Sequence, residues 1–131
     1  MKSKKQKILI VDDDSFLLDI YALKFTKGGF EVITATKGAE AMEKLREGLD
    51  PDIFMLDIVM PSLDGFELLE SARKEKLIKR AVVVMLTNQG QRSDHDRADK
   101  MNVDSYILKA NTTPSEVLEK VTETYNKKRN K

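Results

Sequence analysis

The chain lacks cysteine, tryptophan and any long apolar run, and each absence removes a class of protein. Without cysteine there is no disulfide framework, no thiolate metal site and no thiol nucleophile. The longest apolar runs, Ile8 to Val11 and Ala81 to Leu86, are far shorter than the roughly 20 residues that span a bilayer. The amino terminus also lacks the apolar stretch of a signal peptide. We therefore expect a cytoplasmic protein whose chemistry uses carboxylates, hydroxyls and amines.

Charge is unevenly distributed along the 131 residues. Eight of the 23 basic residues lie in segments 1–7 and 126–131, whereas all 22 acidic residues lie between Ile8 and Tyr125. A body of this size can bury a core, and its acidity argues against the basic face of a nucleic-acid-binding domain. We expect a basic, disordered N-terminal tail over residues 1–7, one folded domain over 8–125 and a basic, disordered C-terminal tail over 126–131.

Five short segments have the apolar and β-branched composition of strands. Three are continuous apolar runs, typical of strands buried on both faces of a parallel sheet, and two mix polarity as edge strands do. The continuous runs are Ile8–Val11, Ile53–Leu56 and Ala81–Leu86, and the mixed ones are Phe30–Thr34 and Ser105–Leu108.

Helical patterns follow each of these segments. Asp14 can cap the first helix, whose expected core stripe is Leu17, Ile20, Tyr21 and Phe25. Further helices are expected over about Ala39–Arg46, from about Gly65, and over Arg92–Met101, the last polar and marginal. The final helix begins at a capping box formed by Thr113, Pro114 and Glu116. The alternation predicts one α/β domain with a parallel sheet and helices on both faces.

Polar residues follow four of the five predicted strands, at the carboxyl edge where open parallel sheets carry their functional groups. They are Asp12, Asp13 and Asp14 after the first strand, Asp57 after the third, Thr87 at the end of the fourth and Lys109 after the fifth. Taken singly, each has an ordinary alternative as a helix cap, turn residue or solvated side chain. The prediction of a functional site therefore depends on finding all of these polar residues together at one edge of the sheet.

Several ionised carboxylates can lie together only if a cation holds them. With oxygen ligands and no cysteine or nearby histidine, a hard ion such as Mg²⁺ fits and zinc is disfavoured. Lys109 and Thr87 add a positive charge and a hydroxyl that can bind a tetrahedral anion such as phosphate. This combination indicates phosphoryl transfer.

These motifs resemble those of the receiver domain of bacterial two-component response regulators, from Ile8 to about Tyr125. Segment 8–14 resembles the family's acidic pair after strand one, and segment 55–65 its phosphoacceptor loop. Segments 85–87 and 106–109 resemble its switch threonine and its switch aromatic with the following lysine. The resemblance implies a flavodoxin-like (βα)5 three-layer sandwich with a five-stranded parallel sheet in the order 2-1-3-4-5.

The resemblance also assigns a role to each site residue. Asp57 would be the nucleophile that takes a phosphoryl group from a phosphohistidine. Asp13, Asp57 and the backbone carbonyl of Val59 would bind Mg²⁺ directly, and Asp12 would hold a metal-bound water. Lys109 would pair with a phosphoryl oxygen.

The same resemblance implies a switch. Thr87 would donate its hydroxyl to the phosphoryl group, and Tyr106 would then favour a buried rotamer. The implied partners are a sensor histidine kinase or phosphotransfer protein, and a downstream target that binds the face of the fourth helix, fifth strand and fifth helix. The domain is expected to be a monomer or a phosphorylation-dependent dimer, and to catalyse only its own phosphorylation and dephosphorylation.

Four positions bear on how the site differs from the family pattern. Ala110 follows Lys109 where the family usually has a proline after a cis peptide, so this bond is either trans or strained. Asn88 follows Thr87 where a small residue is usual. Val59 and Gln89 occupy the variable positions that tune phosphoryl lifetime in the family.

Two other functions remain alternatives. A small Mg²⁺-dependent phosphohydrolase of the haloacid-dehalogenase type would want a second aspartate two residues after the nucleophile, where Val59 lies. A phosphorylation-independent scaffold would be favoured by the loss of Asp57 or Lys109, and both are present. Because the sequence ends soon after Tyr125, we expect output through a partner, although a piece of a longer regulator would look the same.

Overall fold

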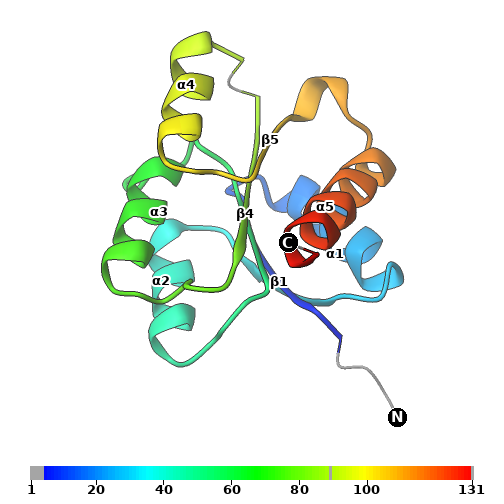
Figure 1. Cartoon of the computed structure of the whole chain (residues 1–131), viewed down its shortest axis with the longest axis horizontal. Helices are drawn as coiled ribbons and strands as arrows, with labels where there is room; N and C mark the ends of the chain where they lie inside the picture. The colour runs from blue at the N-terminus through cyan, green and yellow to red at the C-terminus, as the bar shows by residue number, and fades with distance from the viewer. Residues whose placement is uncertain (1–4, 89, 131) are drawn as a thin grey trace.

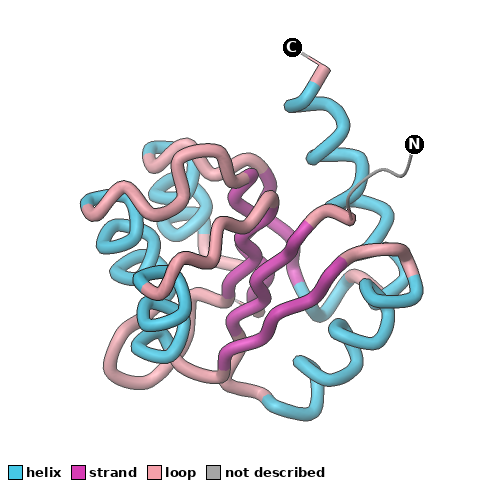
Figure 2. The backbone as a smooth tube through the Cα atoms, turned by 90° about the horizontal axis from the view of Figure 1, so that it is seen from below, coloured by secondary structure: helices cyan, strands magenta, loops and turns pink. Residues whose placement is uncertain are grey.

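A five-stranded sheet forms the centre of the computed structural model, which describes residues 5–88 and 90–130. The strands are β1 (Lys7–Val11), β2 (Glu31–Ala35), β3 (Ile53–Leu56), β4 (Val82–Thr87) and β5 (Ser105–Leu108). All neighbouring pairs are parallel, in the order β2-β1-β3-β4-β5. Figure 2 shows the strands side by side with helices on both sides. The predicted flavodoxin-like fold and strand order are confirmed.

The described residues form α1 (Ser15–Lys27), α2 (Gly38–Arg46), α3 (Gly65–Lys74), α4 (Arg92–Lys100) and α5 (Pro114–Arg129). Figure 1 shows α1 and α5 on one face of the sheet and α2, α3 and α4 on the other. Successive side chains of a strand point to opposite faces, so Ile8 and Ile10 pack in the core beneath α1 and α5, whereas Leu9 and Val11 pack beneath α2 and α3. This two-sided burial explains the continuous apolar strands.

Side-chain caps set the start of three helices. The Asp14 carboxylate accepts a hydrogen bond from the Leu17 N–H, and Thr113 and Glu116 form the predicted capping box. A second capping box, between Asp64 and Glu67, was missed in the sequence, although its spacing is the same. These caps fix where each helix leaves the loop at the carboxyl edge of the sheet.

The core stripe of α1 differs from the prediction. Leu18, Tyr21 and Phe25 are buried, whereas Leu17 and Ile20 are half-buried. The buried set has i, i+3, i+7 spacing, which follows one face of a helix more closely than the predicted set does. Helix α4 is polar as expected, with Ala98 its one buried residue.

The predicted C-terminal tail is largely helical, which corrects the boundary at Tyr125. Helix α5 continues to Arg129, and the Lys128 ammonium lies 2.9 Å from an Asp104 carboxylate oxygen. At the other end, Lys7 already belongs to β1. Of the tail lysines, those at positions 2, 4 and 131 lie outside the described residues. No helix in the described part of the chain is long and apolar enough to cross a membrane.

Candidate functional site

The order of the strands brings Asp12 and Asp57 together. Asp12 directly follows β1 and Asp57 directly follows β3, and these strands are neighbours with Val11 paired to Leu56. The Asp57 N–H donates to the Val11 carbonyl at 3.0 Å, which extends the pairing to the first residue beyond the strand. Two carboxylates therefore leave the sheet side by side, and both residues are buried.

Lys109 directly follows β5 at the same carboxyl edge of the sheet and joins the two carboxylates. Its Nζ lies 2.6 Å from Asp12 Oδ2 and 2.8 Å from Asp57 Oδ2. The lysine side chain is 6% exposed and that of Asp12 is 3% exposed. Burial is tolerated because each charge has an opposite charge at hydrogen-bond distance. Lys109 begins a short 3-10 helix, Lys109–Asn111, which was not predicted.

Asp13 completes an acidic cluster with these two aspartates. One carboxylate oxygen from each of Asp12, Asp13 and Asp57 lies within 4.8 Å of the others. Asp13 is exposed, whereas the other two are buried, so the cluster opens to solvent on one side. Oxygen donors at this separation can share one hard divalent cation. The predicted grouping of the three aspartates is thus present.

Loop hydrogen bonds orient the buried carboxylates. Asp12 Oδ1 accepts from the Asp14 N–H at 3.0 Å, and Asp57 Oδ1 accepts from the Val59 N–H at 3.3 Å. Each carboxylate thus uses one oxygen for its own loop and the other for Lys109. Val59, two residues after Asp57, is 55% exposed.

Burial and charge pairing shift two pKa values in the site. Burial raises the pKa of Asp12, and the hydrogen bond from Lys109 offsets only part of that increase. Burial alone would lower the pKa of Lys109, but hydrogen bonds to Asp12 and Asp57 outweigh it, so the pKa rises. Lys109 is therefore a stable cation at neutral pH, suited to holding anionic oxygens.

The two predicted switch residues lie on adjacent strands. Thr87 is the last residue of β4 and is fully buried, and its partner across β5 is Leu108, which precedes Lys109. Tyr106 lies on β5 and is half-buried, and burial raises the pKa of its phenol. Its ring lies 4.9 Å, between centroids, from the ring of His95 on α4. The contact between His95 and Tyr106 depends on how α4 packs beside β5, which the sequence alone does not show.

The structure describes two of the positions at which the sequence departs from the family pattern, Ala110 and Asn88. The described residues contain no cis peptide bond, so the bond between Lys109 and Ala110 is trans. Asn88 is exposed immediately after β4. Gln89 lies outside the described residues.

Gly65 ends the segment that resembles the phosphoacceptor loop and begins α3, and the sequence does not predict how closely it packs on the backbone of Asp57. A Cβ at this position would lie 2.2 Å from the Asp57 carbonyl oxygen and 2.8 Å from the Ile58 Cα. The Gly65 N–H donates to the Ile58 carbonyl at 2.8 Å. The first residue of α3 is thus packed directly on the backbone that carries Asp57, and only glycine fits.

We expect Gly65→Ala to lower the free energy of unfolding by about 1–3 kcal/mol, because the methyl group must displace backbone rather than a flexible side chain. The same displacement should weaken Mg²⁺ binding at the neighbouring carboxylates. Urea unfolding and calorimetric Mg²⁺ titration measure the two effects. Gly48→Ala is the comparison for a glycine with positive φ and open space, and should destabilise without changing Mg²⁺ affinity.

The fold and the site together define a flavodoxin-like α/β protein with its functional groups at the carboxyl edge of the sheet. The family described as response regulator receiver domain matches residues 8–122. The chain therefore belongs to the response regulator receiver family of two-component signalling.

Relatives of this chain include regulators of different lengths. The probable transcriptional regulator ycf27 of Pyropia yezoensis is 36% identical over 109 residues, which are 83% of this chain and 43% of that protein. The chemotaxis protein CheY1 of Helicobacter pylori is 33% identical over 116 residues, which are 88% of this chain and 93% of that protein. The chain thus spans less than half of the first relative and nearly all of the second.

The fold is shared with solved receiver structures. The crystal structure of a CheY-like response regulator receiver domain protein from Methanospirillum hungatei superposes with a TM-score of 0.87 at 29% identity. That comparison covers 97% of this chain and 98% of the other.

Proposed function

We propose that this receiver domain accepts a phosphoryl group on Asp57 from the phosphohistidine of a sensor histidine kinase or phosphotransfer protein. The observation that carries the proposal is the bridge from Lys109 Nζ to Asp12 and Asp57, at 2.6 Å and 2.8 Å. It places a nucleophilic carboxylate beside a permanent cation at a site open to solvent. The reaction takes place in the cytoplasm, where the kinase presents its phosphohistidine.

Mg²⁺ fits the donor set of this site. Asp13, Asp57 and the Val59 carbonyl would bind the ion directly, and Asp12 would hold one of its waters. The oxygen-only donors and their mutual distances within 4.8 Å support this choice over zinc. When bound, the ion neutralises the charge that gathers between the carboxylates and the incoming phosphoryl group.

The transfer itself is a displacement at phosphorus. A carboxylate oxygen of Asp57 forms a bond to phosphorus while the P–N bond to the donor imidazole breaks, and the imidazole nitrogen leaves with the electron pair. The product is an acyl phosphate. Lys109 then pairs with a phosphoryl oxygen, which replaces the Asp57 oxygen that it holds in the resting state. Water attack on the acyl phosphate returns Asp57 and phosphate, and the domain acts on no other substrate.

The signal leaves the domain through α4, β5 and α5. Thr87 donates its hydroxyl to the phosphoryl group, a role supported by its position at the end of β4 between β3 and β5. Helix α4 can respond because Ala98 is its only buried residue and Tyr106 touches it through His95. A target protein, or a second phosphorylated copy, binds the altered face. The face formed by α4, β5 and α5 thus has two states, and new hydrogen bonds to the phosphoryl group favour one of them.

The direct test is intact mass after incubation with acetyl phosphate. With Mg²⁺ present, we expect a gain of one phosphoryl group that is lost in mild base, and with EDTA no gain. Phosphoryl gain that is insensitive to EDTA would contradict the metal assignment. Consumption of acetyl phosphate over many turnovers without a retained group would favour a phosphohydrolase instead.

A further inference from the structure

A hollow of ≈ 510 Å³ opens at the amino edge of the sheet, away from Asp57. It lies between the start of β1, the start of β3 and the last turns of α5, and we call it the basic pocket. Its lining includes Lys5, Asp52, Arg80, Tyr125, Lys128 and Arg129. The two basic ends of the sequence thus meet at one place, although they are more than a hundred residues apart in the chain.

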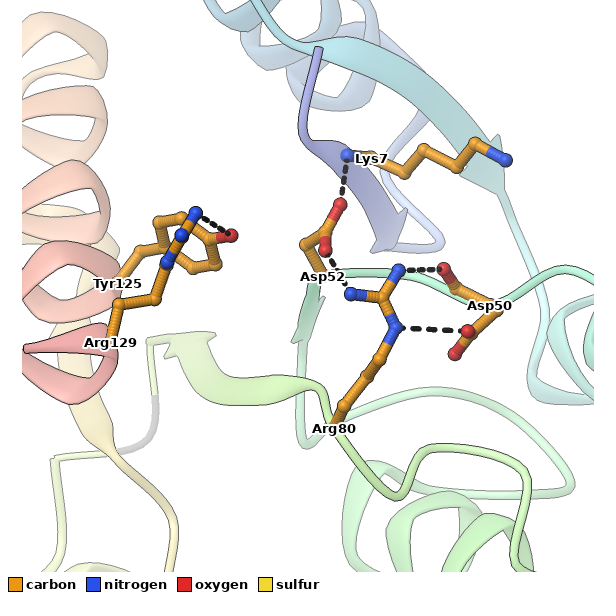
Figure 3. A network of polar contacts seen from close by, with 6 residues as sticks. All are labelled: Lys7, Asp50, Asp52, Arg80, Tyr125 and Arg129. Atoms are coloured by element: carbon orange, nitrogen blue, oxygen red, sulfur yellow. Dashed lines mark hydrogen bonds and ion pairs between the residues drawn. The ribbon is translucent and has the colours of Figure 1, made fainter. Parts of the chain in front are cut away.

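Among the described residues, Asp52 is the one carboxylate that lines the basic pocket, and its charge is already compensated. Arg80 Nη1 donates to Asp52 Oδ1 at 2.6 Å, and Arg80 Nε donates to Asp50 Oδ2 at 2.9 Å. The Lys7 backbone N–H donates to Asp52 Oδ2 at 2.7 Å (Figure 3). Both oxygens of Asp52 are therefore occupied, so it presents little negative charge to a ligand.

Besides Lys7, whose side chain points away from Tyr125 and Arg129 in Figure 3, two cations of the basic pocket are uncommitted. Within the described part of the chain, neither Lys5 nor Arg129 forms an ion pair with a carboxylate. The Arg129 guanidinium lies over the Tyr125 ring, 5.8 Å from its centroid, and Nη1 donates to the Tyr125 hydroxyl at 3.4 Å. That hydroxyl can in turn donate its own proton. Two cations and an O–H group thus face one hollow.

The shape and surroundings favour a compact anion over an extended one. The volume is within the range of about 300–1,000 Å³ that is usual for small-molecule sites. A nucleic acid would extend past the rim, where Asp50 and Asp104 pair with Arg80 and Lys128 and break the positive surface. A ligand that stays inside the hollow meets mainly cations.

We propose that the basic pocket binds a small, multiply phosphorylated anion through Lys5, Arg129 and the Tyr125 hydroxyl, with Lys128 beside them. This site is separate from the phosphoryl-accepting site. Asp52 and Asp57 lie at the two ends of β3, five residues apart, which is about 16 Å along a strand. The proposal does not depend on the function assigned to Asp57.

Calorimetry of the full chain with inorganic triphosphate, in EDTA and at low salt, tests the proposal. The double variant Lys5→Gln, Arg129→Gln should weaken binding at least tenfold, because it removes the two cations that the proposal assigns to the ligand. The control variant Lys27→Gln, Lys100→Gln removes the same charge from exposed helix ends and should change binding less than twofold. Circular dichroism of both variants checks that the fold is retained.

Further measurements separate the sources of the anion. Amide NMR shifts caused by triphosphate should cluster at Gln6, Asp52 and Lys128, not at Asp13 or Val59. Tighter binding of ATP than of triphosphate would identify a nucleotide as the ligand, and equal binding a phosphate chain alone. Equal weakening in both double variants would overturn the proposal in favour of diffuse attraction. If a short DNA duplex binds more tightly than triphosphate, and the Lys5→Gln, Arg129→Gln variant loses that binding, the proposal would be overturned in favour of a nucleic-acid surface.

Discussion

Replacing Asp57 with asparagine should remove phosphoryl acceptance completely, because a carboxamide oxygen is not an anionic nucleophile. The amide keeps the shape of the side chain, and its one oxygen can still accept either the hydrogen bond from Lys109, 2.8 Å long, or that from the Val59 N–H, 3.3 Å long. Lys109 also stays paired with Asp12. The fold should therefore be retained. Intact mass after incubation with acetyl phosphate and Mg²⁺ measures the loss, and thermal unfolding confirms the fold.

Asp96→Asn is a matched control for this experiment. Asp96 is an exposed carboxylate on α4, so its variant should gain the same phosphoryl mass as the unaltered chain. A phosphorylated Asp57→Asn variant would show that another carboxylate, with Asp13 the first candidate, is the nucleophile.

Lys109→Met should slow phosphorylation by about 10²–10³-fold, the usual cost of removing one positioned group that stabilises developing negative charge. It should also destabilise the domain in EDTA by about 3–5 kcal/mol, because Asp12 and Asp57 are left buried without their cation. Mg²⁺ should restore most of that stability and bind more tightly than before, because it no longer competes with the ammonium group. Rate assays by mass and urea unfolding with and without Mg²⁺ measure these effects.

The increase in Mg²⁺ affinity separates a specific role of Lys109 from general damage. A misfolded variant would lose Mg²⁺ binding rather than strengthen it. Lys100→Met, at the exposed end of α4, should leave the rate, stability and affinity unchanged. An unchanged phosphorylation rate in Lys109→Met would show that Lys109 has no role in the transfer step.

The position of the site could be predicted from sequence because parallel strands present their carboxyl ends at one edge. Asp12, Asp57, Thr87 and Lys109 each end or follow a strand, and the structure places all of them at that edge. The alternation of strands and helices predicted the class of fold. The strand order came from the family resemblance, since alternation alone does not say which strands are neighbours.

The contacts that depend on distant segments could not be predicted. The bridge of Lys109 to two carboxylates requires the length and direction of a side chain in a packed fold. The close approach of Gly65 to Asp57 requires the path of the loop between them. The sequence predicts disordered tails at the basic ends because local sequence does not show that α5 ends beside β1.

The Arg80 ion pairs give the two ends of the sheet different mechanical properties. Arg80 precedes β4 and forms ion pairs with Asp50 and Asp52, which precede β3. Asp52 in turn accepts a hydrogen bond from the first backbone amide of β1. These contacts connect the starts of three strands. At their other ends, the tie is an ammonium group that can exchange its partners. The buried faces of the strands set their register, and the ties at the strand starts add to it. Loops at the carboxyl edge can therefore rearrange around a new anion while the sheet keeps its pairing.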